Sequence, residues 1–220
     1  SDSITPDFNH LESFGNGWVS AGLAFKPYAC GTMTQPFVDC ALQASNVLKS
    51  ENIKEIHAHV GEGTVHRLWE PLEEKRNPST PYGAKFSVPY CVAIGFLVGK
   101  AGLNEFTEEQ LSRDDIRSLT SKIHYSINPK DPYPGDYIGW IDVIDIEGNK
   151  HTFKQSCLRG GKQEPMSQQE LEEKFTSNLG FASLDNQNIK SARDCVNQLF
   201  NSKNNIRECV KTLATIGEKS

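Results

Sequence analysis

The stretch IGWIDVIDIEGNKHTFKQSC, residues 138–157, decides the fold class. Residues 138–146 and 150–157 are strand candidates, and the short segment Glu147-Gly148-Asn149 lies between them. Glycine and asparagine tolerate the positive φ angles of a tight turn, so this stretch predicts a β-hairpin. Because a hairpin joins antiparallel neighbours, the sequence argues against a wholly parallel, doubly wound sheet.

Further strands are predicted on the N-terminal side of the hairpin. Residues 53–60 alternate apolar and polar side chains, with His57 and His59 on the polar face, and indicate a half-exposed strand. Residues 18–25 and 122–127 also suit strands. Their order in the sheet does not follow from the sequence, so the sheet is expected to be antiparallel or mixed.

Two helices are predicted to be buried against this sheet. Thr34 can cap a helix over residues 34–50, with Pro36 in its first turn, where the missing N–H group costs least. Residues 87–98 begin with Ser87-Val88-Pro89 and are apolar on most faces, which indicates a central helix.

Two more helix starts carry the capping-box pattern, in which a hydroxyl and a residue three positions later satisfy each other's backbone donors. These are Thr107 with Gln110 and Ser167 with Glu170. Residues 73–83, by contrast, contain prolines and charged side chains and predict a loop.

The pattern changes after residue 180, where strand candidates end. Apolar residues at helical spacing then form two sets: Ile189, Ala192, Val196 and Leu199, followed by Ile206, Val210 and Leu213. We therefore predict an α+β domain over residues 1–182, with helices packed on an antiparallel or mixed sheet. A helical C-terminal tail follows over residues 183–220.

The composition is that of a globular chain. Of 220 residues, 37% are hydrophobic and 23% charged, and the longest apolar run is about half of the roughly 20 residues that a membrane span needs. The 23 Lys and Arg against 28 Asp and Glu give a net charge of −5. This disfavours nucleic acid as a partner, because phosphate binding requires a basic surface. We expect neither a nucleic-acid nor a membrane partner.

The six cysteines are widely spaced, and no two of them form a CxxC motif. A disulfide framework and a zinc ribbon are therefore not expected. Cys40, Cys91, Cys195 and Cys209 lie among apolar residues and are expected to be buried thiols in a reducing compartment. The first five residues show no secretion signal, which favours a cytoplasmic location, or the mitochondrial matrix in a eukaryote.

Local patterns that could carry chemistry are weak. His57 and His59 could bind one metal ion from one strand face, although a polar outer face is the simpler interpretation. Cys30 could be a nucleophile beside a histidine, but no spacing identifies that histidine. Gly61-Glu62-Gly63 and Arg159-Gly160-Gly161 do not continue as phosphate-binding loops and indicate turns.

Longer motifs resemble the C-terminal portion of the MmgE/PrpD family. Residues 24–30 (AFKPYAC), followed by Thr34-Gln35-Pro36 and Asp39, are similar to the family's KPYPCC…TH…ID segment. Residues 84–93 (AKFSVPYCVA) are similar to its KFSLPYAVA segment. Matching pieces continue in order to residue 181, so the resemblance covers residues 18–181.

The family includes 2-methylcitrate dehydratase, cis-aconitate decarboxylase and iminodisuccinate epimerase. The resemblance implies the site-completing domain of a metal-independent lyase for di- or tricarboxylates, most readily of the 2-methylcitrate dehydratase type, with no cofactor. It also implies that an N-terminal helical domain, outside this sequence, would pack on the tail, and that the enzyme is a homodimer. One alternative is cis-aconitate decarboxylase or iminodisuccinate epimerase activity within the same family. The others are a non-catalytic domain for carboxylate binding or oligomerisation, and a metal module resting on His57 and His59.

The resemblance assigns site residues one by one. Lys26 matches the family lysine that faces the active site, and Tyr90 matches a tyrosine that lines it; both are predicted to be catalytic. Lys85, Arg159 and Gln35 are predicted to contribute to substrate binding. Many relatives carry histidine at the position of Gln35, and an amide cannot act as a base. No metal ligand is predicted.

Overall fold

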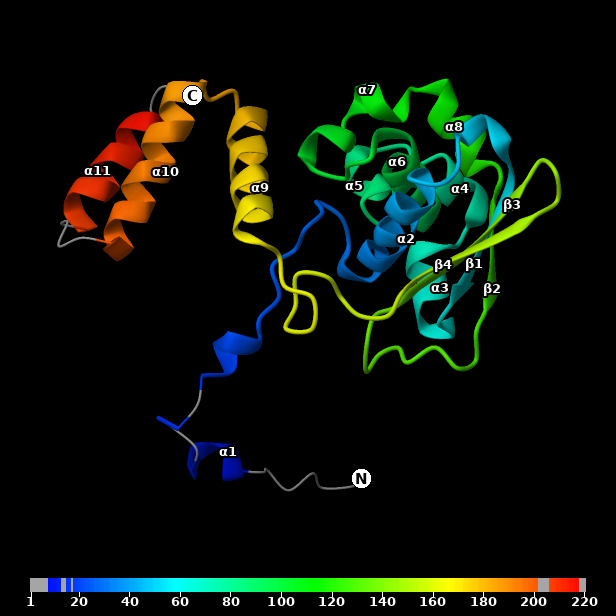
Figure 1. Ribbon diagram of the computed structural model, residues 1–220, viewed down its shortest axis with the longest axis horizontal. Helices are drawn as coiled ribbons and strands as arrows, with labels where there is room; N and C mark the ends of the chain where they lie inside the picture. The colour runs from blue at the N-terminus through cyan, green and yellow to red at the C-terminus, as the bar shows by residue number, and fades with distance from the viewer. Residues whose placement is uncertain (1–7, 13–14, 17, 202–205, 218–220) are drawn as a thin grey trace.

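The computed structural model of the chain describes residues 8–12, 15–16, 18–201 and 206–217. An α+β body holds the sheet, three helices at the C-terminal end stand beside it, and the N-terminal segment extends away from both (Figure 1). The expected absence of a secretion signal concerns residues 1–5, which lie outside the described part of the chain. Within that part, no helix combines the length and the apolar character needed to cross a membrane.

The sheet is mixed. It contains β1 (Ile53–Val60), β2 (Ile123–Ile127), β3 (Gly139–Asp145) and β4 (Lys150–Gln155), in the spatial order β2-β1-β3-β4. β1 is parallel to β2 and antiparallel to β3, and β3 is antiparallel to β4. The prediction of an antiparallel or mixed sheet is confirmed, and the parallel pair at one edge makes it mixed.

The predicted hairpin connects β3 to β4. The carboxylate of Asp145 accepts hydrogen bonds from the backbone N–H groups of Glu147 and Asn149 at 3.0 and 2.8 Å. Gly148 adopts a φ of 89°, a conformation that favours glycine because a side chain would clash with the backbone. The aspartate and the glycine together fix the turn, and the turn sets the register of the two strands.

Helices cover the apolar face of the sheet. α2 (Gln35–Ser45) packs on β3 and β4, α6 (Val88–Val98) packs on α2, and α8 (Asp114–Thr120) packs on α6. α6 is the central helix, as predicted: its residues 88–96 are all buried. Its hydroxyl cap is also present, because Ser87 Oγ accepts a hydrogen bond from the Tyr90 N–H group at 3.0 Å.

The helix predicted over residues 34–50 is shorter than expected and ends at Ser45. Thr34 does not cap it through its side chain: the hydroxyl instead donates to the Gly31 carbonyl at 2.7 Å, in the 3-10 turn η2 (Thr32–Thr34). Asn46 ends the helix, so Val47 is exposed rather than part of the buried stripe.

Two predictions of local structure are wrong. Residues 18–25 do not form a strand: η1 (Val19–Gly22) is followed by extended chain without a sheet neighbour among the described residues, and Trp18 is 82% exposed. The side chains suit a strand, but only a strand partner would satisfy its backbone. Residues 73–83 are not wholly loop, because α4 (Leu72–Arg76) and α5 (Pro81–Ala84) form single turns there.

The remaining short elements connect these units. Thr107 is the N-cap residue before one of them, α7, and its hydroxyl accepts from the Gln110 N–H group as predicted, whereas the Gln110 amide oxygen accepts from Arg113 Nη1 at 2.8 Å instead of completing the capping box. These elements are α1 (Asn9–Glu12), η3 (Ser50–Asn52), η4 (Glu62–Thr64), α3 (Val65–Leu68), η5 (Leu103–Glu105) and α7 (Glu108–Leu111).

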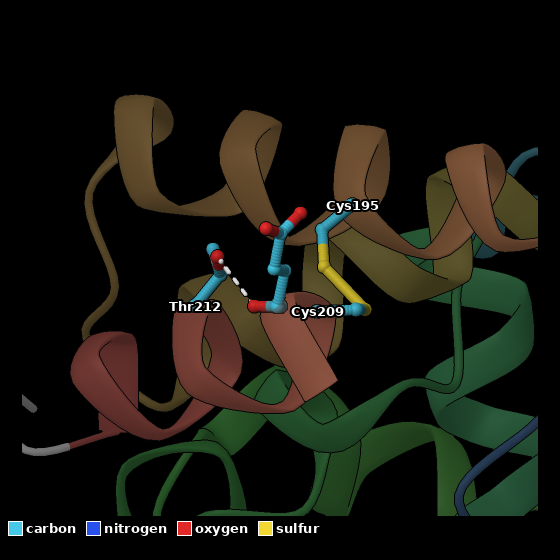
Figure 2. Close-up of a disulfide and its surroundings, with 4 residues drawn as sticks. Cys195, Cys209 and Thr212 are labelled. Atoms are coloured by element: carbon cyan, nitrogen blue, oxygen red, sulfur yellow. Dashed lines mark hydrogen bonds between the residues drawn. A yellow bond between two sulfur atoms is a disulfide. The ribbon is translucent and has the colours of Figure 1, made fainter. Parts of the chain in front are cut away.

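The C-terminal region is helical, as predicted, with α9 (Gln168–Phe181), α10 (Asn186–Asn201) and α11 (Ile206–Gly217). The capping box of Ser167 and Glu170 begins α9. Cys195 and Cys209 are joined by a disulfide between α10 and α11 (Figure 2), so the expectation of two free thiols is wrong. The helical hairpin brings their Cα atoms to 5.5 Å, within the range that a disulfide spans.

Candidate functional site

A cavity of about 690 Å³ opens between α9 and several segments of the body, among them residues 26–33 before α2 and residues 82–86 before α6. Its wall combines four cationic side chains and four tyrosines from segments that are far apart in the sequence. The cations are Lys26, Arg67, Lys85 and Lys174, and the tyrosines are Tyr28, Tyr82, Tyr133 and Tyr137.

The lining has an excess of positive charge. Among the described residues that line the cavity there is no aspartate or glutamate. The four cationic groups also form no ion pair with any carboxylate in the described part of the chain. In a protein of net charge −5, the concentration of positive charge at one concave site favours the binding of anions there.

Backbone hydrogen bonds bring the two lysines predicted from the sequence to one wall. The Ala29 N–H group donates to the Ala101 carbonyl, and the Gly31 N–H group donates to the Lys85 carbonyl, both at 2.8 Å. The chain after Lys26 is thereby held against the start of the segment that leads into α6. This pairing places Lys26 and Lys85 on the same cavity.

Tyr28 lines the cavity, and its hydroxyl bonds to two charged residues that are not among the described lining residues. It donates a hydrogen bond to Asp39 Oδ1 and accepts one from Arg159 Nη1 at 3.2 Å. Burial, with the charge of Asp39 acting in the same direction, raises the pKa of Tyr28 well above its usual range. The hydroxyl therefore stays protonated and serves here as a hydrogen-bonding group.

A comparison with protein families finds one family model that covers most of the chain. The family model of the MmgE/PrpD C-terminal domain matches residues 28–198. The chain belongs to the MmgE/PrpD family. The matched range contains Arg67, Lys85 and Lys174, and it starts two residues after Lys26.

Two curated proteins are similar to part of this MmgE/PrpD domain. Human cis-aconitate decarboxylase is 31% identical over 103 residues, which is 46% of this chain and 21% of that protein. The mouse cis-aconitate decarboxylase is 26% identical over 102 residues, with the same coverage. The similar region thus spans about a fifth of the length of these relatives.

Of the five site residues predicted for this MmgE/PrpD domain, two line the cavity: Lys26, which is exposed, and Lys85, which is half-buried. Tyr90 lies inside the protein at 1% exposure, and its hydroxyl donates to the Glu105 carbonyl at 2.8 Å. Its catalytic role remains a prediction, and the structure does not bring its hydroxyl to the cavity.

The other two predicted residues also lie behind the wall. Gln35 is 1% exposed, and neither its amide nitrogen nor its amide oxygen has a hydrogen-bond partner among the described residues. Arg159 faces three protein carboxylates, those of Asp39, Glu164 and Glu170. A direct contact of Gln35 or Arg159 with substrate therefore remains a prediction.

Sequence reasoning missed five residues that line the cavity. These are Arg67, Lys174, Tyr82, Tyr133 and Tyr137. No sequence pattern singled out Arg67, and Lys174 lies on a helix for which only its capping pattern stood out. Charged residues on a helix are usually solvated, so no sequence pattern marks Lys174 as a site residue. Only the docking of α9 brings it to the cavity.

The histidine pair lies on the outer face of the sheet, away from the helices. His57 Nε2 is 2.9 Å from Ser126 Oγ, and His59 Nε2 is 2.8 Å from Asp142 Oδ2. In the described part of the chain, no three His, Cys, Asp or Glu residues are grouped so that they could hold a metal ion. The two histidines belong to a polar hydrogen-bonded face, as the simpler interpretation proposed.

Cys30 lines the cavity but has a cysteine as its neighbour rather than a histidine. A hydrogen bond with Cys91 holds the pKa of Cys30 below its ordinary value, whereas burial raises the pKa of Cys91. Cys40 and Cys91 are free and buried, as predicted, and Cys30 is free and buried as well. The expectation of a partner histidine for Cys30 finds no support in the described contacts.

Proposed function

We propose that this domain completes the substrate site of a lyase that acts on a polycarboxylate. The observation that carries the proposal is the cavity of about 690 Å³ with four cationic side chains and no carboxylate among its described lining residues. Two or three carboxylates of one small ligand would balance these charges. The membership of the MmgE/PrpD family and the similarity to cis-aconitate decarboxylases support a lyase reaction.

The chemistry gives the lysines a purpose. Removal of a proton α to a carboxylate, or loss of CO₂, leaves negative charge on an enolate-like group in the transition state. A positioned ammonium group stabilises that charge in the partly desolvated cavity, where electrostatic interactions are stronger than in water. We assign this role to Lys26, and the anchoring of the remaining carboxylates to Lys85, Arg67 and Lys174.

Two reactions compete within this proposal. Dehydration of 2-methylcitrate is the expectation from the sequence motifs, and decarboxylation of cis-aconitate is favoured by the names of the two curated relatives. Both substrates are tricarboxylates, so the charge of the cavity suits either. An assay of the two substrates side by side, with the domain joined to the helical domain proposed below, decides between them.

The proposal includes partners and a compartment. We propose that an N-terminal helical domain supplies the acid and base groups, that the assembled enzyme is a homodimer, and that it acts in the cytoplasm or the mitochondrial matrix. A non-catalytic domain that binds carboxylates or mediates oligomerisation is the second candidate. If the assembled enzyme turns over either tricarboxylate, and if this turnover is lost when Lys26 is replaced, the non-catalytic candidate is wrong.

Binding to the chain itself tests the central claim. Isothermal titration with citrate, a stable tricarboxylate, should show saturable binding to the wild-type chain. Lys85→Gln should weaken it about tenfold, because one charge-assisted contact is lost. Lys54→Gln removes an exposed lysine on β1, outside the cavity lining, and should leave the affinity unchanged. Equal affinities for all three proteins would contradict the proposal.

A further inference from the structure

One face of α9 connects the cavity to the body. Glu170, Lys174 and Asn178 follow one another at intervals of four residues and therefore lie on the same side of the helix. Lys174 and Asn178 line the cavity. Leu171 and Phe175 line a separate groove, together with residues of α10. Figure 1 shows α9 as the member of the three C-terminal helices that stands next to the body.

Glu170 has two distinct sets of partners at the start of this helix. Its Oε2 atom accepts hydrogen bonds from the Ser167 N–H and hydroxyl groups at 2.8 and 2.9 Å, which closes the capping box. Its Oε1 atom accepts a hydrogen bond from Arg159 Nη2. The glutamate thus joins the first turn of α9 to the loop that contains Arg159.

Arg159 is in turn held by the wall of the cavity. Nη1 donates to the Tyr28 hydroxyl at 3.2 Å and lies 3.9 Å from Asp39 Oδ1, and Nε lies 3.8 Å from Glu164 Oε1. Its side chain is 23% exposed. A guanidinium group surrounded in this way has its charge balanced by the protein, so it is better suited to joining segments than to binding an anionic substrate.

We infer that Arg159 is a positioning residue that holds α9 in place through Glu170, so that Lys174 completes the anion-binding cavity. This inference rests on the proposed function for the importance of Lys174, but the attachment of the helix stands on its own contacts. It gives Arg159 a role different from substrate binding, and it makes Lys174 a binding residue whose placement depends on a contact one helical turn away.

Hydrogen exchange tests the attachment without any ligand. Arg159→Gln should speed amide exchange in residues 168–181 about tenfold, since the ion pair to the body is lost. Glu170→Gln should do the same, while its amide keeps the capping box, which accepts either Glu or Gln. Glu173→Gln removes an exposed charge from the same helix and is the matched control. Unchanged exchange in both test variants would overturn the inference.

Citrate titration tests the consequence for the site. Lys174→Gln should weaken citrate binding about tenfold, and Arg159→Gln should weaken it by a similar factor. Combined with Lys174→Gln, Arg159→Gln should have little further effect, because Lys174 is the charged side chain that α9 contributes to the described cavity lining. A multiplied loss in the double variant would mean that Arg159 contacts citrate directly, and would overturn the positioning role.

The two proposals fail in different ways. If the wild-type chain does not bind citrate, the proposed function is contradicted, while the exchange experiment still decides whether Arg159 holds α9. If citrate binds and Lys85→Gln weakens it, but neither Arg159→Gln nor Glu170→Gln changes exchange or affinity, the proposed function stands and the positioning role is wrong.

Discussion

The hydroxyl of Tyr28 donates a hydrogen bond to the buried carboxylate of Asp39. Asp39 is 5% exposed, and its Oδ2 atom has no hydrogen-bond partner among the described residues. Burial raises the pKa of Asp39 to about 6, against the opposing effects of the Tyr28 hydrogen bond and the Arg159 charge. The wall of the cavity therefore depends on a carboxyl group that titrates just below neutral pH.

This shift predicts a pH dependence of stability with a definite sign. Because the folded pKa is above the ordinary value, the folded protein binds more protons than the unfolded chain between about pH 4 and pH 6. The free energy of unfolding should therefore fall as the pH rises through this window, by on the order of 2–3 kcal/mol from this group. Urea unfolding at a series of pH values measures it.

Asp39→Asn should lack this component of the pH dependence, since its amide does not titrate but still accepts from Tyr28. Asp115→Asn is the control of opposite sign, because the Arg113 hydrogen bond lowers the pKa of Asp115. In the wild type, the contribution of Asp115 to the free energy of unfolding is lost as the pH falls, whereas that of Asp39 is lost as the pH rises. Parallel curves for the wild type and Asp39→Asn would contradict the prediction.

Lys26→Ala should abolish most of the activity of the assembled enzyme while leaving the fold intact, because Lys26 is exposed and outside the core. Loss of a positioned charge donor typically lowers turnover by about 10²–10³. Steady-state kinetics with 2-methylcitrate and cis-aconitate measure the effect, and circular dichroism checks the fold. Unchanged turnover would make Lys26 an ordinary solvated lysine.

The disulfide predicts a stability change confined to the tail. Cys195 and Cys209 are 14 residues apart, and closing a loop of this length stabilises a folded unit by about 3 kcal/mol in the chain-entropy account. Replacing both with alanine should speed amide exchange in α10 and α11 and leave β1 unchanged. A reducing agent should reproduce the effect in the wild type and have none in the double variant.

Gly139→Ala should destabilise the body by about 1–3 kcal/mol, the usual cost of overpacking. An added Cβ would lie 2.3 Å from the Pro36 carbonyl oxygen, where α2 packs closely on β3. Gly180→Ala is the matched control: nothing lies within 4 Å of its added Cβ, and alanine is the better helix former. Thermal unfolding should show a lower midpoint for Gly139→Ala and an equal or higher one for Gly180→Ala.

The outer face of α11 predicts self-association. Ile206, Val210 and Leu213 are 70%, 59% and 39% exposed and fall on one side of the helix. If an N-terminal helical domain normally covers this stripe, the isolated chain should associate through it. Light scattering should show a concentration-dependent mass that Val210→Glu reduces. A strict monomer at all concentrations would favour a self-sufficient domain.

The sequence by itself determined the elements whose signals are local. The turn at Gly148, the hydroxyl caps at Thr107 and Ser167 and the apolar run of α6 each depend on neighbours within a few residues, and all were predicted. The strand predicted over residues 18–25 failed for the complementary reason, because a strand also requires a partner elsewhere in the chain.

The candidate site divides in the same way. Lys26 and Lys85 could be predicted from the sequence because each lies in a continuous motif that resembles the family, residues 24–30 and 84–93. Only the tertiary structure decided that Lys174 reaches the same cavity, that Arg159 faces Glu170 rather than the cavity, and that Cys195 meets Cys209. These contacts depend on how whole helices dock, and docking is fixed by the packing and charge of surfaces that are distant in sequence.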